Sequence, residues 1–146
     1  MVINEKINIT EKASWVILKD PVAEVRKAVN DKDYFKTVTY ACSVLEYTGQ
    51  MILLWHSKNT PKPLTDKEVQ EWKLDRVTKE LRKCGLITDT DVMKIDSIRK
   101  LRTKFIHEKL SIRITSEIAE QVDALNDDII YYVGHMKDKY DKSAPA

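Results

Sequence analysis

Apolar residues recur in steps of three and four along most of the chain, which is typical of core-facing α-helices. The longest such run predicts a helix that starts at Asn30 or Asp31, with the apolar positions Tyr34, Val38, Ala41, Leu45, Thr48, Ile52 and Trp55. A second run starts at Ser116 and ends near Tyr140, with the apolar positions Ile118, Val122, Leu125, Ile129, Val133 and Met136. Alternation of the kind found in β-strands is confined to Ile112–Ile114.

Capping residues place the remaining helices. Asp20 followed by Pro21 predicts a helix start, since a carboxylate at the N-cap and proline in the first turn are both favourable there. A short helix is also expected around Glu11–Leu18, and Asn59–Pro63 is expected to form a loop. The residues from Thr65 to Glu68 form a capping box.

The capping box predicts a third helix that runs to Gly85, a residue suited to the left-handed position after a helix end. The fourth helix is expected over Asp91–Glu108, with its cap in 88–91, and the polar residues from Lys139 are expected to fray. Together the patterns predict an all-α protein, an antiparallel four-helix bundle with an additional short N-terminal helix or helices. We expect one domain over 1–146, with the bundle core at about 21–140 and a frayed tail at 141–146.

Composition adds few constraints. The 146 residues are 42% hydrophobic and 33% charged, with only three glycines and four prolines, as expected for an ordinary globular helical protein. Cys42 and Cys84 have no partner at metal-ligand spacing and are expected to be two buried free thiols, and no cofactor or metal is implied. Neither a signal peptide nor a membrane-spanning apolar run is visible, so the expected location is cytoplasmic.

The net charge is only +2, but its distribution is uneven. Between Met93 and Arg113, seven basic residues outnumber two acidic ones, whereas Ile114–Ile130 contains five acidic residues and no basic one. Such neighbouring stripes are more often a solvated surface or an intramolecular match than a polyanion site. If the basic stripe binds RNA, the side chains expected to contact it are Arg99, Lys100, Lys104, Lys109 and Arg113.

Arg102 is the unusual residue of the fourth predicted helix. On a helical wheel of about 100° per residue, it lies within roughly 10° of the centre of the apolar arc. The residues of this arc are Val92, Ile95, Ile98, Leu101, Phe105 and Ile106. Because a buried unpaired charge costs several kcal/mol, the guanidinium must meet a carboxylate, meet carbonyl groups or open into a groove. Glu46 follows the core line of the long helix and is a candidate partner, although a solvated glutamate is an equally good interpretation.

His107 follows Arg102 by five positions, which separates the two side chains by roughly 140° on a straight helix. A shared target therefore requires a distorted helix end or a groove completed by a second copy. Histidine moves protons near neutral pH, and arginine binds phosphate oxygens with its two-pronged guanidinium. This pair suits metal-independent cleavage of a phosphodiester, although the spacing also occurs by chance.

The segment IDSIRKLRTKFIHEKL, followed by SIRITSE and a terminal helix, resembles the HEPN superfamily of helical bundles, whose motif is Arg, four to six residues, then His. NDKDYFKTVTYACSVLEYT is similar to the family's earlier long helix. The resemblance covers about Asn30–Tyr140. It implies a homodimer in which the two Arg102 and His107 pairs, one from each copy, face each other across a cleft. It also implies metal-independent endoribonuclease activity in active members. Many members of the family are toxins of toxin–antitoxin pairs or RNA-targeting defence proteins.

One departure from the family pattern leaves the function open. Active members often have Asn, Asp or His directly after the arginine, where this chain has Thr103, whose hydroxyl is neither acid nor base near neutral pH. Two alternatives to an RNA-cleaving enzyme therefore remain. One is a catalytically inactive HEPN-like module that docks to a nucleotidyltransferase-like or other protein partner, and the other is a purely structural bundle. An antitoxin is a further possible partner. His56 and His135 are expected to be surface residues.

Overall fold

The structure is a computed structural model that describes the backbone of residues 20–108 and 116–145, and the side chains of α6 only as far as Phe105. The described part of the chain is helical and contains no strand. Its elements are α2 (Pro21–Asn30), α3 (Tyr34–Ser57), α4 (Asp66–Gln70), α5 (Leu74–Lys83), α6 (Asp89–Glu108), α7 (Ser116–Ala124) and α8 (Asn126–Ser143). The predicted all-α class is confirmed; the expected helix at 11–18 and the alternation at 112–114 lie outside the described residues.

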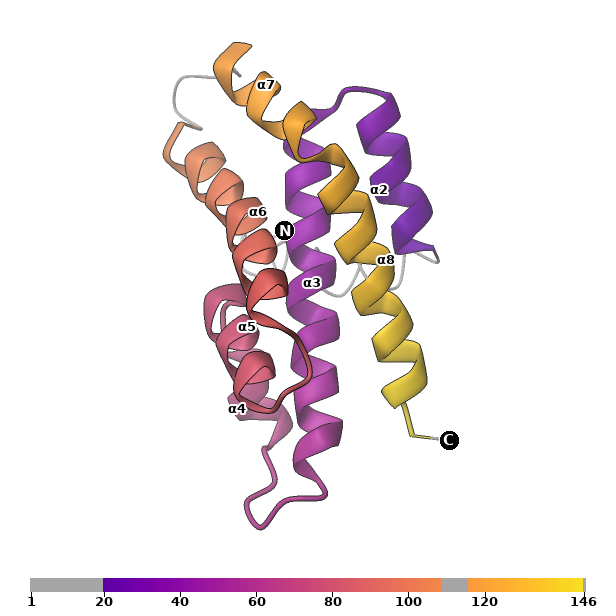
Figure 1. Cartoon of the computed structure of the whole chain (residues 1–146), viewed down its shortest axis with the longest axis vertical. Helices are drawn as coiled ribbons and strands as arrows, with labels where there is room; N and C mark the ends of the chain where they lie inside the picture. Colours follow the sequence, from indigo (N-terminus) through magenta and orange to yellow (C-terminus); the bar gives the residue numbers. More distant parts are fainter. Residues whose placement is uncertain (1–19, 109–115, 146) are drawn as a thin grey trace, which may run out of the picture.

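Helix α3 lies at the centre of the bundle, with α2, α8, α6 and the α4–α5 pair arranged around it (Figure 1). Helices α2 and α6 run opposite to α3, whereas α8 lies beside α3 and runs in the same direction (Figure 1). Trp55 and Tyr140, near the ends of α3 and α8, accordingly pack with ring centroids 5.1 Å apart. None of the helices in the described ranges is both long and apolar enough to cross a membrane.

One apolar core joins these helices, and the predicted stripes supply much of it. In α3 the buried predicted positions are Val38, Ala41, Leu45, Thr48 and Ile52. In α7 and α8 they are Ile118, Val122, Ile129, Val133 and Met136. Tyr34, Trp55 and Leu125 are partly buried at the edge of the core.

The predicted caps are present. The Asp20 carboxylate accepts a hydrogen bond from the Ala23 amide at 3.1 Å, and Thr65 accepts one from the amide of Glu68 at 3.2 Å. Gly85 adopts a left-handed conformation with φ of 72°. The expected start of α3 at Asn30 or Asp31 was wrong by a few residues, because α2 continues to Asn30 and Asp33 is the N-cap.

The helix predicted from the capping box to Gly85 is broken into α4 and α5. Val69 and Leu74 are both buried, yet five residues of continuous helix would separate their directions by roughly 140°. A break allows both side chains to reach the core. Gln50 of α3 stabilises the break, since its side-chain amide donates to the Trp72 carbonyl oxygen at 2.9 Å.

The helix predicted from Ser116 is also broken, at Leu125, which lies between α7 and α8 and is the N-cap of α8. The Leu125 carbonyl accepts from the Ile129 amide, and Asp127 and Asp128 occupy the first turn of α8, where acidic residues favour a helix start. The expected fraying from Lys139 was wrong, since α8 continues to Ser143. Pairs four residues apart, such as Lys142–Asp138 at 2.9 Å, stabilise this last part.

Only one of the two thiols is buried. Cys42 is inaccessible, whereas Cys84 is exposed, which contradicts the expectation for Cys84. The physical reason is its position at the C-cap of α5, directly before the turn at Gly85, where the side chain no longer faces the core.

Candidate functional site

Helix α6 is fixed at its start by a reciprocal cap and along its length by the core. The Thr88 amide donates to Asp91 at 2.9 Å, and the Asp91 amide donates to the Thr88 hydroxyl at 3.2 Å. The predicted apolar arc is largely confirmed, since its buried members are Ile95, Ile98, Leu101 and Phe105. Arg102 is therefore held on a rigid element between core residues.

The Arg102 side chain reaches the edge of the core and meets Glu46 of α3. Its Nη2 lies 3.5 Å from Oε2 of Glu46, and the side chains are 25% and 24% exposed, respectively. Of the two interpretations of Glu46 that the sequence left open, the pairing with Arg102 is the one present. This contact is the one hydrogen bond of the guanidinium within the described part of the chain, and no buried polar side-chain atom there lacks a partner. Within the described part of the chain, the other N–H groups of Arg102 have no hydrogen-bond partner.

Cys42 lies close to this ion pair, one turn before Glu46 on α3. Its Sγ is 3.9 Å from the Ile98 carbonyl oxygen. Burial raises the pKa of the Cys42 thiol to about 12, with Arg102 opposing this rise and Glu46 adding to it. A thiol that stays protonated at neutral pH is a poor nucleophile. Cys42 is therefore an apolar core residue next to the ion pair.

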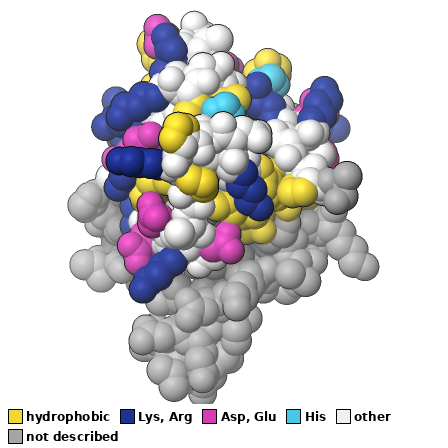
Figure 2. Space-filling view, turned by 90° about the horizontal axis from the view of Figure 1, so that it is seen from below, with side chains coloured by type: hydrophobic (Ala, Val, Ile, Leu, Met, Phe, Trp, Pro, Cys, Tyr) yellow, Lys and Arg dark blue, Asp and Glu magenta, His cyan; other side chains and the backbone are white. Residues whose placement is uncertain are grey.

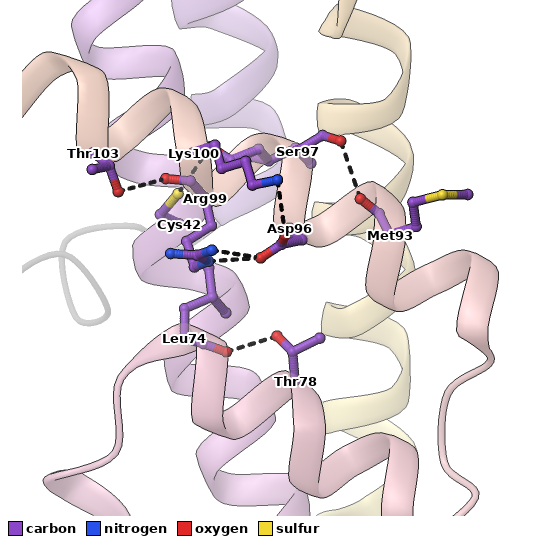
Figure 3. Close-up of polar contacts among 10 residues, drawn as sticks. Cys42, Leu74, Thr78, Met93, Asp96, Ser97, Arg99, Lys100 and Thr103 are labelled. Atoms are coloured by element: carbon purple, nitrogen blue, oxygen red, sulfur yellow. Dashed lines mark hydrogen bonds and ion pairs between the residues drawn. The ribbon is translucent and has the colours of Figure 1, made fainter.

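The basic stripe is matched by acceptors from the protein itself. Figure 3 shows Asp96 between Arg99 and Lys100, with contacts of 2.7 Å to Nη2 of Arg99 and 3.5 Å to Nζ of Lys100. Burial alone would raise the pKa of the Asp96 carboxyl, but the hydrogen bonds and charges of Arg99 and Lys100 leave it below its usual value. Asp96 therefore remains ionised and offsets the charge of both basic residues.

Two other basic residues of α6 have partners on other helices. Lys94 lies 3.4 Å from Asp128 of α8, which joins the basic stripe to the acidic one. Lys104 donates to the side-chain oxygen of Gln121 of α7 at 2.7 Å. The predicted RNA contacts Lys109 and Arg113 lie outside the described residues. In the described part, the stripe is thus largely an intramolecular match.

The two remaining residues of the predicted motif are Thr103 and His107, and the structure describes the side chain of Thr103 alone. Thr103 is exposed, and its hydroxyl donates to the Arg99 carbonyl oxygen at 3.4 Å, one turn back on the same helix (Figure 3). His107 belongs to α6, but its side chain lies outside the described residues. The convergence of Arg102 and His107 therefore stays a prediction.

A shallow hollow of about 230 Å³ lies between α5 and α6, beside the Arg99–Asp96 pair. Its lining combines two acidic and two basic side chains with Thr78 and Val92, namely Asp75, Lys79, Asp96 and Arg99. Arg99 is one turn before Arg102 on α6, but neither Arg102 nor Glu46 lines the hollow.

The other histidines are surface residues, as expected. His56 is exposed in the last turn of α3. His135 of α8 is partly buried and stacks on exposed Tyr131, with ring centroids 5.4 Å apart.

In the view from below, described side chains of both charge signs surround an apolar area (Figure 2). This end of the molecule therefore presents a mixed surface, without the single-sign field that attracts a polyanion.

Two residues of the site were missed from the sequence. Asp96 entered only the charge balance, although its spacing of three and four to Arg99 and Lys100 is the usual signal for helical ion pairs. The second is Phe35 of α3, whose ring meets Phe105 of α6 with centroids 5.7 Å apart. It precedes Cys42 by seven positions and Glu46 by eleven, which places all three on one side of α3. The spacing indicates this side, but the contact with Phe105 depends on how α3 and α6 pack.

Comparison with known proteins gives no relative: no family model, curated protein or solved structure matches the chain. Across the described ranges, no three His, Cys, Asp or Glu side chains are grouped as a metal site requires.

Proposed function

We propose that this protein is an RNA-directed, HEPN-like homodimer that cleaves RNA without a metal, with His107 moving a proton and Arg102 binding the phosphate. The observation that supports it best is the state of Arg102. Its guanidinium is positioned by a rigid helix and by Glu46, the side chain is a quarter exposed, and its other N–H groups make no hydrogen bond to a described residue. A cation held in this way suits the charge that develops on a phosphodiester during cleavage.

The proposed reaction uses the RNA's own 2′-hydroxyl as the nucleophile. Its oxygen forms a bond to phosphorus while the bond from phosphorus to the 5′ oxygen breaks, which leaves a 2′,3′-cyclic phosphate and a 5′-hydroxyl. One copy of His107 accepts the proton of the 2′-hydroxyl, and a second copy from the other subunit returns a proton to the leaving oxygen. Arg102 stabilises the negative charge on the phosphate oxygens. A second copy completes the proposed groove, because a straight α6 would separate the two side chains of one copy by roughly 140°.

The test is incubation of the purified protein with structured RNA in EDTA. We expect fragments that end in cyclic phosphate or its hydrolysis product, and we expect His107→Ala to abolish them. His56→Ala is the matched control, since His56 is an exposed histidine at the far end of α3. Cleavage by His107→Ala at the rate of the parent protein would show that the mechanism is wrong.

A second candidate function is supported by the contacts of α6. Thr103 is bonded back to its own helix, and Arg99, Lys100 and Lys94 are matched by carboxylates. These contacts favour a catalytically inactive HEPN-like module that docks to a nucleotidyltransferase-like or other protein partner. In that case the purified protein leaves RNA intact, and His107→Ala binds the partner as tightly as the parent does.

A further inference from the structure

Phe35 is a large apolar side chain at the surface. It lies in the first turn of α3 and is 53% exposed. Its ring meets Phe105 of α6 edge to face, with centroids 5.7 Å apart and an angle of 84° between the planes. Phe105 itself is buried in the core. The exposed ring is therefore held in place by a buried one.

Phe35 lies on the same side of α3 as the candidate site. Residues seven and eleven positions apart point in nearly the same direction on a helix, which aligns Phe35 with Cys42 and Glu46. Glu46 contacts Arg102, Cys42 contacts the α6 backbone at Ile98, and Phe35 contacts α6 at Phe105. These three contacts define the seam between α3 and α6, with Arg102 along it and Phe35 at one end.

We propose that Phe35 is a stacking platform for a base of the RNA whose phosphate Arg102 binds. The inference rests on the proposed function and adds a residue that selects unpaired nucleotides. An aromatic ring stacks on any base, because every base has a π-face, and it does so beside a cation that holds the backbone. A base within a duplex is already stacked on its neighbours, so the platform favours loops and single strands.

The surroundings favour a base over a protein partner. A stable protein interface buries about 800 Å² on each side and has an apolar centre. Phe35 is the one exposed large apolar side chain of α3 among the described residues: the other two are Met93, near the start of α6, and Tyr131 in α8. A single exposed ring at the end of the seam along which Arg102 lies matches the size of one base.

The experiment measures binding of short single-stranded RNA that carries one fluorescent base, 2-aminopurine, whose emission falls when it stacks. We expect Phe35→Ala to weaken binding at least fivefold and to abolish the fall in emission, because a base–aromatic stack contributes about 1–3 kcal/mol. Phe35→Trp should retain both. Phe35→Leu keeps apolar contact with Phe105 but has no aromatic face, so it should fold normally and still lose the stack. Met93→Ala is the matched control for loss of an exposed apolar side chain.

The outcomes separate this proposal from the proposed function. If Arg102→Ala loses RNA binding while both Phe35→Ala and Phe35→Leu bind as the parent does, Phe35 is not a platform although the RNA function stands. If the parent protein binds neither single-stranded nor structured RNA, both proposals are overturned. If the Phe35 variants change the dimer dissociation constant in sedimentation and leave RNA affinity unchanged, the ring belongs to a protein interface and the proposal is wrong.

Discussion

Arg102 and Glu46 lie 56 positions apart in the chain and meet at 3.5 Å across α6 and α3. The contact is long for a charge-assisted hydrogen bond, whose usual N to O distance is about 2.7–2.9 Å. Glu46 therefore keeps the guanidinium in position without binding it tightly. A phosphate that reaches Arg102 competes with one carboxylate at the edge of the core.

The first prediction concerns this competition. Glu46→Gln keeps a side-chain oxygen that can accept from Arg102 but removes the negative charge that repels phosphate. We expect RNA to bind severalfold more tightly, as measured by fluorescence anisotropy. Because both side chains are about a quarter exposed, we expect the free energy of unfolding to change by no more than about 1 kcal/mol.

Asp138→Asn is the control for Glu46→Gln. It removes the same charge from an exposed pair with Lys142 on α8. Its effect on RNA affinity should be small, since it lies near the C-terminal end of α8. Weaker RNA binding by Glu46→Gln, with Asp138→Asn unchanged, would show that the charge of Glu46 is needed to position Arg102.

The second prediction concerns Asp96, which holds both Arg99 and Lys100. Asp96→Asn frees these two cations to contact phosphates. For single strands, the logarithm of the binding constant falls with the logarithm of salt concentration by about 0.7 per phosphate contact. We expect the salt dependence to steepen by one to two such contacts. Asp141→Asn, which removes an acidic partner of Lys137, should leave the slope unchanged. An unchanged slope in Asp96→Asn would indicate that Arg99 and Lys100 do not contact RNA.

The third prediction separates the two thiols. Cys42 is fully buried, and burial raises its pKa to about 12, so at pH 8 almost none of it is thiolate. Cys84 is exposed, although partial burial and the charge of Glu80 raise its pKa as well. A disulfide exchange reagent should therefore react with one thiol per folded chain and with two in denaturant. Cys84→Ser should remove the reaction of the folded protein, and rapid reaction of two thiols before unfolding would contradict the structure.

The sequence was most informative where a single helix determines the outcome. The caps at Asp20 and Thr65 and the left-handed Gly85 depend on neighbouring residues alone, and they are present as predicted. The breaks at Trp72 and Leu125 were missed. At Trp72 the break depends on Gln50, twenty-two positions away in the chain, and on the need to bury Val69 and Leu74 together.

In the candidate site, too, the features that one helix determines were recognisable from the sequence, and those that depend on two helices were not. Arg102 was recognisable because a charge in an apolar arc requires a partner, and Glu46 was recognisable because it continues the core line of α3. The position of Phe35 against Phe105 depends on how α3 and α6 are set against each other, which no spacing within one helix determines.

The last prediction tests the close packing of α3 on α5. A Cβ added at Gly49 would lie within 2.4 Å of Cγ1 of Val77 and 3.2 Å of Cδ1 of Leu81. Val77 is completely buried, so it has little room to move, and overpacking of this kind costs about 1–3 kcal/mol. Replacing a helical glycine by alanine otherwise gains about 0.5–1 kcal/mol.

Gly49→Ala should therefore lower the free energy of unfolding by about 1–2 kcal/mol, since the clash exceeds the gain in helix propensity. Gly134 of α8 is the matched control, because a Cβ there has no heavy atom within 4 Å. Gly134→Ala should raise the free energy of unfolding by about 0.5–1 kcal/mol. Denaturant titration of both variants measures the difference. If the two substitutions shift the midpoint in the same direction, α3 and α5 are not as close at Gly49 as the structure places them.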